Sequence, residues 1–404
     1  MASANESTPG AAAGPLAGVR VLDAGQMVAG PFAATLLADY GADVVKLERP
    51  GQGDSLRALG RRKDGVSLWW HACNRNKRMI AIDLSDEQGR EIFLALAAQA
   101  DVLVESYVPG ALERLGLGPE VLAQANPRLV VLQVSGFGQT GPYAGWPGFA
   151  RTSEAFSGLT QLTGYADRPP LSISAFPLSD YVSGLFGAFA VMAALRERDA
   201  SGRGQRVDLA LNEGIFRMME HACIAYDQLG VLGQRAGGRH EQACPVGIWP
   251  AQDGMQISLA VGTDRMAHKL FEAIGRADLI EDPRFATSPL RVRHREQLEP
   301  IIAGWIAARS SAEVLRVLGP SGVAVSPLMT MDAIFRDPQY LARGNVVRVA
   351  DEALGQVALP GVIPKLSRTP GSVRHAAHGI DADRASILAD WLAHAGPLSP
   401  ERNP

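Results

Sequence analysis

The chain has 404 residues, 47% of them hydrophobic, so it is long enough for two domains with a sizeable core. Its formal net charge of −3 is nearly balanced, which argues against a general nucleic-acid binder and a binder of membrane surfaces. The three cysteines, Cys73, Cys223 and Cys244, are too few and too widely spaced for a disulfide framework or a zinc site. We therefore expect a reducing compartment, the cytoplasm.

Two stretches bear on targeting. Residues 1–15 are rich in Ala, Gly, Ser and Pro and lack a basic start followed by an apolar stretch. They predict a disordered tail and not a secretory signal. The longest uncharged apolar run, Tyr181–Leu195, contains two glycines and is shorter than the ~20 residues that a membrane helix needs. It predicts a buried core helix and no membrane association.

From residue 18 to about 136, short runs rich in Val, Ile and Leu alternate with helical patterns. The predicted strands are Val19–Asp23, Asp43–Leu47, Ile80–Leu84, Asp101–Glu105 and Leu129–Val134. This alternation predicts βαβ units, and hence an α/β fold whose Rossmann-like parallel sheet carries helices on both faces. We assign residues 16–230 to this large domain. Ligands of such sheets bind at the carboxyl ends of the strands.

The helices expected in the large domain follow from their starts and their periodicity. Pro31–Asp39 begins with proline at a favoured first position, and Ser85–Ala98 has the capping-box spacing between Ser85 and Gln88. Two further helical stretches are Asp180–Arg196 and Asn212–Leu229.

After Gly230 the pattern changes, and we assign residues 235–330 to a smaller α+β domain. Asp253-Gly254 predicts a hairpin turn between Ile248–Ala251 and Gln256–Val261. Predicted helices in this domain are Asp264–Ile274, Arg291–Ala308 and Ala312–Leu318. The C-terminal stretch 337–404 contains strand patterns at Val346–Ala350 and Gln356–Leu359 and a helical pattern at Ala385–Ala393.

Several common catalytic motifs are absent from the sequence. It has no phosphate-binding Gly-x-x-x-x-Gly-Lys-Ser/Thr loop, no Gly-x-Gly-x-x-Gly after the first strand, no Gly-x-Ser-x-Gly and no His-Glu-x-x-His. The eight histidines are scattered without metal-ligand spacing. The sequence therefore gives no reason to expect a metal or a redox cofactor.

One acidic residue, Asp180, opens the long apolar helix that contains Gly184 and Gly187. A carboxylate at a helix start is stabilised in its ionised form by the helix dipole, and an ionised carboxylate can attack an acyl carbon. The two glycines would let another backbone approach that face closely. The local pattern alone leaves two readings open, a helix cap and a nucleophile, and caps are the commoner of the two.

A second cluster of candidate residues lies on the predicted strand-to-helix turns. Gln26–Pro31 joins the first strand to the first helix, where backbone N–H groups can hold an anion. Arg49, the segment Asn74–Arg78, and Ser106–Gly110 with Arg114 bring cations near strand ends. A ligand that carries phosphates is one reading, and a set of solvated surface charges is the other.

Taken in order, a set of motifs resembles the class III coenzyme A transferases, also called the CaiB/BaiF family, over about residues 15–370. The motifs are Leu22-Asp23 followed by Ala29-Gly30-Pro31, Gly41–Glu48, Asn74–Arg78, Ala100–Glu105, Pro109-Gly110 with Arg114–Gly116, Ser135–Pro142, and Gly202–Gln205. The resemblance implies a two-domain α/β subunit that forms an interlocked homodimer, and it gives Asp180 the role of nucleophile.

The same resemblance implies the reaction and the binding residues. Asp180 would attack a donor acyl-CoA and carry CoA as an aspartyl thioester to an acceptor carboxylate. CoA itself is a substrate and product, and no metal or redox cofactor takes part. The positions that match the family's CoA site are Met27, Val28, Ala29, Arg49, Ile82, Tyr107 and Arg114. Backbone donors at Gly136, Phe137 and Gly138 are the candidates for stabilising oxyanions.

Departures from the family pattern reduce the number of reactions that the resemblance leaves open. The racemase branch has a His–Asp pair where this chain has Phe149-Ala150, which counts against the alternative of an α-methylacyl-CoA racemase. Arg151 stands where formyl-transferring members have Glu, and it suits a second carboxylate on the substrate. The segment 149–158 most resembles members that use succinyl-CoA, so a dicarboxylyl-CoA donor is expected. A non-catalytic CoA-binding protein is a third alternative, against which Asp180 argues.

Overall fold

The structure is a computed structural model that describes residues 14–173 and 176–393. Residues 1–13 of the predicted tail lie outside the described residues. The chain forms two compact units. The first unit contains the described residues of Met1–Thr160, Ser172–Val231 and Leu341–Pro404. The second contains Gln161–Leu171 and Leu232–Tyr340.

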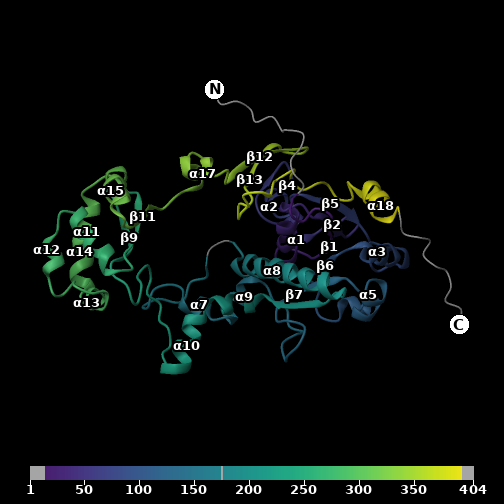
Figure 1. Cartoon of the computed structure of the whole chain (residues 1–404), viewed down its shortest axis with the longest axis horizontal. Coiled ribbons are helices and arrows are strands. Elements are labelled where there is room, and N and C mark those ends of the chain that lie inside the picture. Colours follow the sequence, from purple (N-terminus) through teal and green to yellow (C-terminus); the bar gives the residue numbers. More distant parts are fainter. Residues whose placement is uncertain (1–13, 174–175, 394–404) are drawn as a thin grey trace. The chain divides into compact units, whose positions relative to one another are not determined.

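A six-stranded parallel sheet forms the centre of the first unit, in the order β5-β2-β1-β6-β7-β8 (Figure 1). Its strands are β1 (Arg20–Ala24), β2 (Asp43–Glu48), β5 (Lys77–Ala81), β6 (Val102–Glu105), β7 (Val130–Ser135) and β8 (Arg206–Ala210). The predicted parallel α/β sheet is confirmed. Because all strands run in one direction, their carboxyl ends meet at one edge, where the turns that follow them can form a single site.

Helices cover both faces of the sheet, and each face has its own apolar core. On one face α1 (Ala29–Asp39) and α8 (Leu178–Ser201) pack together with Val21, Val104 and Leu132. On the other face α3 (Glu87–Gln99) and α18 (Arg384–Leu392) pack with Leu22, Leu103 and Val131. The remaining helices of this unit are α2 (Leu68–Cys73), α4 (Ala111–Arg114), α5 (Pro119–Ala125), α6 (Ala150–Phe156), α9 (Leu211–Met218) and α10 (Glu220–Leu229).

Small elements complete the first unit. They are the 3-10 helix η1 (Ser55–Ala58), the antiparallel pair β3 (Arg62–Lys63) and β4 (Val66–Ser67), and the hairpin β12 (Val346–Asp351) and β13 (Gly355–Pro360). The helices α7 (Leu159–Leu162) and α17 (Pro338–Ala342) each span a point in the sequence where one unit ends and the other begins. The C-terminal segment packs on the large sheet, because Trp391 Nε1 donates to Asp43 Oδ2 at 2.8 Å.

The second unit is built around the antiparallel sheet β11-β10-β9. Its strands are β9 (Val246–Pro250), β10 (Gln256–Ala260) and β11 (Ala324–Pro327). Its helices are α11 (Asp264–Ala273), α12 (Asp278–Glu281), α13 (Ser288–Arg293), α14 (Arg295–Ala307), α15 (Ser311–Leu318), the 3-10 helix η2 (Gly319–Ser321) and α16 (Met331–Ile334). The hairpin predicted around Asp253-Gly254 is confirmed, with Ile257 opposite Trp249.

Three local predictions are wrong. The fifth strand of the sheet runs over Lys77–Ala81 and not Ile80–Leu84, because the charge of Lys77 is paired with Asp23 inside the fold. Helix α3 is capped by Asp86, whose carboxylate accepts from Gly89 N at 2.5 Å, whereas Ser85 bonds to Asp83. The stretches predicted as single helices at 212–229 and 291–308 each consist of two helices.

Among the described residues, one helix, α8, is long and apolar enough to cross a membrane by length and composition. In the structure its residues Ala188, Val191, Ala194 and Leu195 are buried in the core between α1 and the sheet. This packing is that of a core helix, as the sequence predicts.

Candidate active site

A cavity of about 240 Å³ lies at the carboxyl edge of the large sheet, beside β1, β6 and β7. Its walls come from the turn after β1, the loop after β6, the segment after β7 and the first turn of α8. The lining residues are Gln26, Met27, Val28, Ala29, Ser106, Tyr107, Val108, Pro109, Val134, Ser135, Gly136, Ala144, Trp146, Pro147, Gly148, Phe149, Asp180 and Leu211. Asp180 is the one carboxylate among them.

Asp180 is the third residue of α8, so it is not the helix cap that the local pattern favours. Its neighbour Tyr181 anchors this turn, because its hydroxyl accepts from Trp69 Nε1 at 2.9 Å and its ring packs edge-on against Phe32. Burial raises the pKa of Asp180 to about 7, and the charge of Glu154 adds to the shift. The expectation that the helix dipole holds Asp180 strongly ionised is therefore wrong, because desolvation and a second carboxylate outweigh it.

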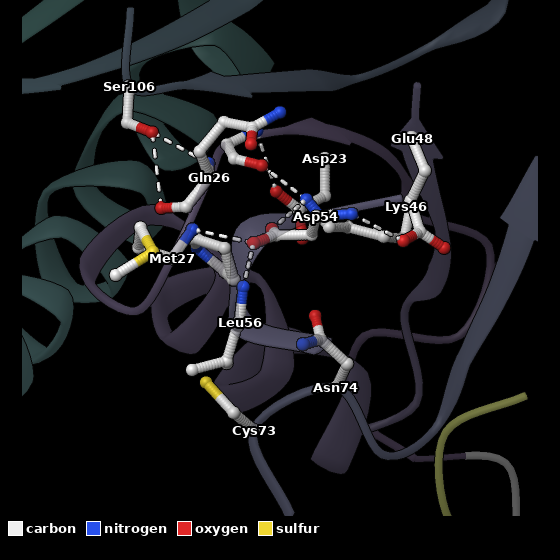
Figure 2. Close-up of polar contacts among 12 residues, drawn as sticks. Asp23, Gln26, Met27, Lys46, Glu48, Asp54, Leu56, Cys73, Asn74 and Ser106 are labelled. Atoms are coloured by element: carbon white, nitrogen blue, oxygen red, sulfur yellow. Dashed lines mark hydrogen bonds and ion pairs between the residues drawn. The ribbon is translucent and has the colours of Figure 1, made fainter. Parts of the chain in front are cut away.

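The turn after β1 is held by hydrogen bonds to three of its amides (Figure 2). Gly25 N donates to Asp23 Oδ1 at 3.0 Å, Gln26 N to Ser106 Oγ at 2.7 Å and Met27 N to Asp54 Oδ1 at 3.1 Å. Met27 has a backbone φ of +64°, a conformation that residues other than glycine adopt at an energetic cost. The surrounding bonds therefore fix a conformation that the turn would not favour by itself.

Buried ion pairs stabilise the side chains that hold this turn (Figure 2). Lys46 Nζ lies 3.1 Å from Asp54 Oδ2 and also donates to the carbonyl of Gly25. Lys77 Nζ lies 2.7 Å from Asp23 Oδ2. All four of these side chains are fully buried. Burial alone would lower the pKa of Lys46, but the carboxylates of Asp23, Asp54 and Glu48 raise it above its ordinary value, so this lysine is charged.

The N-terminus of α1 opens into the cavity with Val28 and Ala29 among the lining residues. Val28 occupies the N-cap position, and no side chain of the described residues caps this end. The amide groups at a helix start carry partial positive charge and seek an acceptor. They therefore suit the oxygen of a thioester or the oxyanion that forms when its carbonyl is attacked.

Of the predicted CoA-binding residues, Met27, Val28, Ala29 and Tyr107 line the cavity together with Asp180. Tyr107 also lines a neighbouring cavity of about 320 Å³ below α4 and α5. Its position is fixed by Glu105, whose Oε2 accepts from Tyr107 N at 2.7 Å. The two cavities share Tyr107, Val108 and Pro109, so both border the loop after β6.

The other predicted CoA-binding residues lie outside these walls. Arg49 follows β2 and is exposed, while Ile82 follows β5, where its amide donates to Glu48 O at 2.9 Å. Arg114 is exposed at the end of α4. All three follow the carboxyl ends of sheet strands, but the structure does not bring them to the Asp180 cavity.

The structure brings one of the predicted oxyanion and substrate residues to the cavity wall and places the others outside it. Gly136 lines the cavity, and a Cβ at this position would lie 2.6 Å from the Cα of Gly148, so the two backbones cross in contact. Phe137 belongs to an aromatic cluster with Tyr143, Trp146 and Phe156. Gly138 is buried next to Asp208, and Arg151 is exposed on α6.

Sequence reasoning missed how the site is held together: it named segments that contain Asp23, Lys46, Lys77 and Ser106 without their holding role, and it did not name Asp54 or Glu154. A signal for the two lysines and their carboxylate partners does exist, because a lysine inside an otherwise apolar strand, as in Asp43–Glu48, needs a buried partner. Glu154 gives no such signal, since its partner on α8 lies 25 residues away in the sequence. Among the described residues, no group of His, Cys, Asp and Glu side chains has the arrangement of a metal site.

A parallel α/β sheet with a carboxylate, an uncapped helix start and apolar walls at its carboxyl edge suits enzymes that transfer acyl groups through a carboxylate. The comparison with known proteins makes this specific: residues 16–384 match CoA-transferase family III, and the chain belongs to this family. Its activity is CoA transfer.

Several characterised relatives cover almost the whole chain. The beta subunit of succinyl-CoA–L-malate CoA-transferase of Chloroflexus aurantiacus is 39% identical, over 94% of each chain. The succinyl-CoA–D-citramalate CoA-transferase of the same organism is 37% identical, also over 94% of each chain. A crystal structure of a CaiB/BaiF family protein from Brucella suis superimposes with a TM-score of 0.83 at 32% identity and covers 94% of this chain and 100% of that one.

Proposed function

We propose that this enzyme moves CoA from succinyl-CoA or another dicarboxylyl-CoA to a carboxylic acid through covalent intermediates on Asp180. The observation that carries the proposal is the position of Asp180, the one carboxylate lining a cavity whose wall includes the uncapped start of α1. The names of the relatives support a succinyl donor and a hydroxylated dicarboxylate as acceptor.

The reaction consists of four acyl transfers. Asp180 attacks the thioester carbon of the donor, the C–S bond breaks, and a mixed anhydride and CoA thiolate result. The thiolate attacks the aspartyl carbonyl and releases the donor acid, which leaves an aspartyl-CoA thioester. The acceptor carboxylate attacks this carbonyl and expels the thiolate again. Finally the thiolate attacks the acceptor carbonyl and returns Asp180 as a free carboxylate. Each step forms one bond and breaks one, so no further reactant is consumed.

The chain's own groups would act on these steps in distinct ways. Amides at the start of α1 and the backbone at Gly136 would donate hydrogen bonds to the attacked carbonyl oxygens, on which negative charge develops. Tyr107 and the turn Met27–Ala29 would hold the CoA chain, and Arg49 and Arg114 its phosphates. Apolar walls at Trp146 and Phe149 would limit the access of water to the anhydride, which hydrolyses readily.

The enzyme's organisation is part of the proposal. We infer a homodimer of interlocked subunits in the cytoplasm, in which residues 16–230 form the CoA-binding domain, 235–330 the small domain and 337–404 a return to the large domain. The exposed apolar side chains on α8, α9 and α10, among them Phe189, Phe216 and Leu229, support a partner surface on the first unit. Arg151 is proposed to pair with the second carboxylate of the substrate.

The experiment that tests the function combines succinyl-CoA with L-malate and follows malyl-CoA by liquid chromatography. Wild-type enzyme should transfer CoA and, with donor alone, give an Asp180 adduct that hydroxylamine traps. Asp180→Asn should reduce transfer at least 10³-fold, because the amide is not a nucleophile. A variant that transfers CoA at the wild-type rate would overturn the mechanism. Exchange of the α-deuterium of an acyl-CoA without an acceptor acid would instead favour the racemase-like alternative.

A further inference from the structure

Glu154 is a buried carboxylate beside the nucleophile that the reaction above does not use. It lies on α6, is only 2% exposed, and its Oε1 accepts from Ser179 N at 3.2 Å. Ser179 is the residue before Asp180, and its hydroxyl donates in turn to Ala150 O at 3.2 Å. Two hydrogen bonds thus clamp α6 to the first turn of α8.

The Ser179 contact makes Glu154 the cap of α8. Pro177 stands at the N-cap position and provides no side-chain acceptor, so the carboxylate of Glu154 satisfies one of the free amides from another helix. A carboxylate in this position also offsets the positive end of the helix dipole. Asp180 therefore gains little from the dipole, and it experiences the negative charge of Glu154 instead.

Other charged and titratable groups surround this region on every element packed against the start of α8. They are Arg151 on α6, Glu213 and Arg217 on α9, Arg206 and Asp208 on β8, Tyr107 in the loop after β6, and Tyr181 on α8 itself. Among all these groups, Glu154 is the one whose charge acts on the Asp180 carboxyl. Burial causes the larger part of the increase in the pKa of Asp180, and the charge of Glu154 adds to it.

Glu154 is not a second acid or base for the substrate, because it does not line the cavity that contains Asp180. Its side chain is enclosed between α6 and α8, so it reaches the reaction only through its neighbour.

We propose that Glu154 is a positioning residue whose buried charge strengthens Asp180 as a nucleophile toward the thioester carbon. The proposal rests on the function proposed above for Asp180. Its chemical reason lies in the leaving groups. An ordinary carboxylate, with a pKa near 4, is a much better leaving group than a thiolate, whose thiol has a pKa of about 8.5. After an ordinary carboxylate attacks a thioester, the carboxylate is therefore expelled again and the thiolate stays.

A more basic Asp180 changes this partition in favour of the reaction. As the basicity of the carboxylate approaches that of the CoA thiolate, the tetrahedral intermediate expels the thiolate more often. In the last step the thiolate and Asp180 exchange places in the opposite sense, so basicities that lie close together keep both this step and the first accessible. A charge that stands behind the nucleophile, out of contact with substrate, provides this match at both steps.

The test is the pH profile of kcat/KM for Glu154→Gln, measured between pH 4.5 and 9. Glutamine keeps an oxygen for Ser179 N and removes the charge, so the fold of the turn is preserved. We expect the wild-type acid limb near pH 7, because that is the pKa of Asp180, and in E154Q it should move to lower pH. Each pH unit of that movement should lower the plateau about threefold for a Brønsted slope of about 0.5. Glu154→Asp, which keeps the charge, should restore the wild-type acid limb.

An exposed control is Glu197→Gln near the other end of α8 from Asp180, which removes one negative charge and should leave the profile unchanged. An acid limb of E154Q that coincides with that of the wild type overturns the proposal, even if the rate falls. If E154Q does not fold, ¹³C NMR of labelled aspartate decides, with D180N assigning the signal. An Asp180 carboxyl that titrates near 4 in the wild type overturns the proposal, because its basicity is then not raised at all.

The two proposals fail separately in this design. Full CoA transfer by D180N removes the covalent mechanism, whatever E154Q does. An inactive D180N together with an unmoved acid limb in E154Q leaves the mechanism intact and removes only the role of Glu154.

Discussion

At the scale of single residues, Asp180, the proposed nucleophile, lies in an environment that disfavours its charge. A carboxyl with a pKa of about 7 in the folded chain and 3.8 in the unfolded chain binds more protons when folded. Stability must therefore fall as the pH rises from about 4 to about 7, and the loss remains at higher pH. The charge of Asp180 is therefore kept at the expense of stability, as is common for groups in active sites.

Asp180→Asn should consequently unfold at higher urea concentration than the wild type at pH 8, with a gain of about 2 kcal/mol, because the amide carries no charge to desolvate. At pH 4.5 the carboxyl of the folded wild type is protonated, and the difference between the two curves should be much smaller than at pH 8. The measurement is urea unfolding followed by circular dichroism at both pH values. An equal difference at both pH values would show that charge is not the cause.

The network around the first turn gives a second prediction at this scale. Asp54 holds Met27 N and pairs with Lys46, and both side chains are fully buried. Asp54→Asn should destabilise the chain by about 3 kcal/mol, because it leaves the Lys46 charge with one partner fewer. It should also raise KM for the acyl-CoA more than it lowers kcat, since the turn that binds CoA loses its fixed conformation.

The matched control for this change is Asp64→Asn in an exposed turn where φ is +52°, a conformation that asparagine tolerates as well as aspartate. It should leave the midpoint of urea unfolding and the KM unchanged. A fall in kcat alone for Asp54→Asn, with KM preserved, would contradict a role in holding the CoA turn.

At the scale of elements, the pair α1 and α8 determines how the first turn and Asp180 meet. A Cβ on Gly184 would lie 2.7 Å from Phe32 Cδ1 and 3.0 Å from the carbonyl oxygen of Ala29. A Cβ on Gly187 would lie 2.9 Å from the side chain of Leu132, which can move, and 3.6 Å from the Cβ of Ala33 on α1, an ordinary contact. The close approach that the two glycines predict is confirmed at Gly184, where the neighbour includes the backbone of α1.

Gly184→Ala should therefore destabilise the enzyme by about 2 kcal/mol, even though alanine favours a helix by up to about 1 kcal/mol over glycine. Gly187→Ala should cost less. Gly304→Ala on α14 is the control, because nothing lies within 4 Å of its Cβ, and it should stabilise slightly. Urea unfolding of the three variants measures this order, and a Gly184→Ala variant as stable as Gly304→Ala would refute the close packing of α1 on α8.

The elements also show what sequence can and cannot predict. The strands of the large sheet were predictable because their apolar runs are bounded by turn residues, and β2 matches within one residue. The position of β5 and the cap of α3 depend on which polar neighbour forms the contact. Asp23 pairs with Lys77, and Asp86 accepts the hydrogen bond from Gly89 N. The same distinction applies to the residues of the candidate site. Asp180, Met27 and Tyr107 were found through ordered motifs, whereas Glu154 and Asp54 act through tertiary contacts that no local pattern records.

At the scale of the whole molecule, α8 presents two different faces. One face is buried on α1 and the sheet, and the other exposes an apolar stripe at helical spacing, formed by Leu185, Phe189 and Met192. Phe189 is 73% exposed. An exposed apolar stripe on a helix is a common sign of a protein interface.

Phe189→Asp should therefore weaken the proposed dimer, because a charge placed in an apolar contact is desolvated without a partner. Light scattering after gel filtration should give the mass of two chains for the wild type and a shift toward one chain, about 43 kDa, for the variant. Ala98→Asp provides the control, since it adds the same charge at an exposed position on α3, on the opposite face of the sheet. A variant that keeps the mass of two chains and the thermal stability of the wild type would place the interface elsewhere. A wild type with the mass of one chain would remove the dimer itself, and CoA transfer by that single chain would then show that the cavity around Asp180 is complete without a partner.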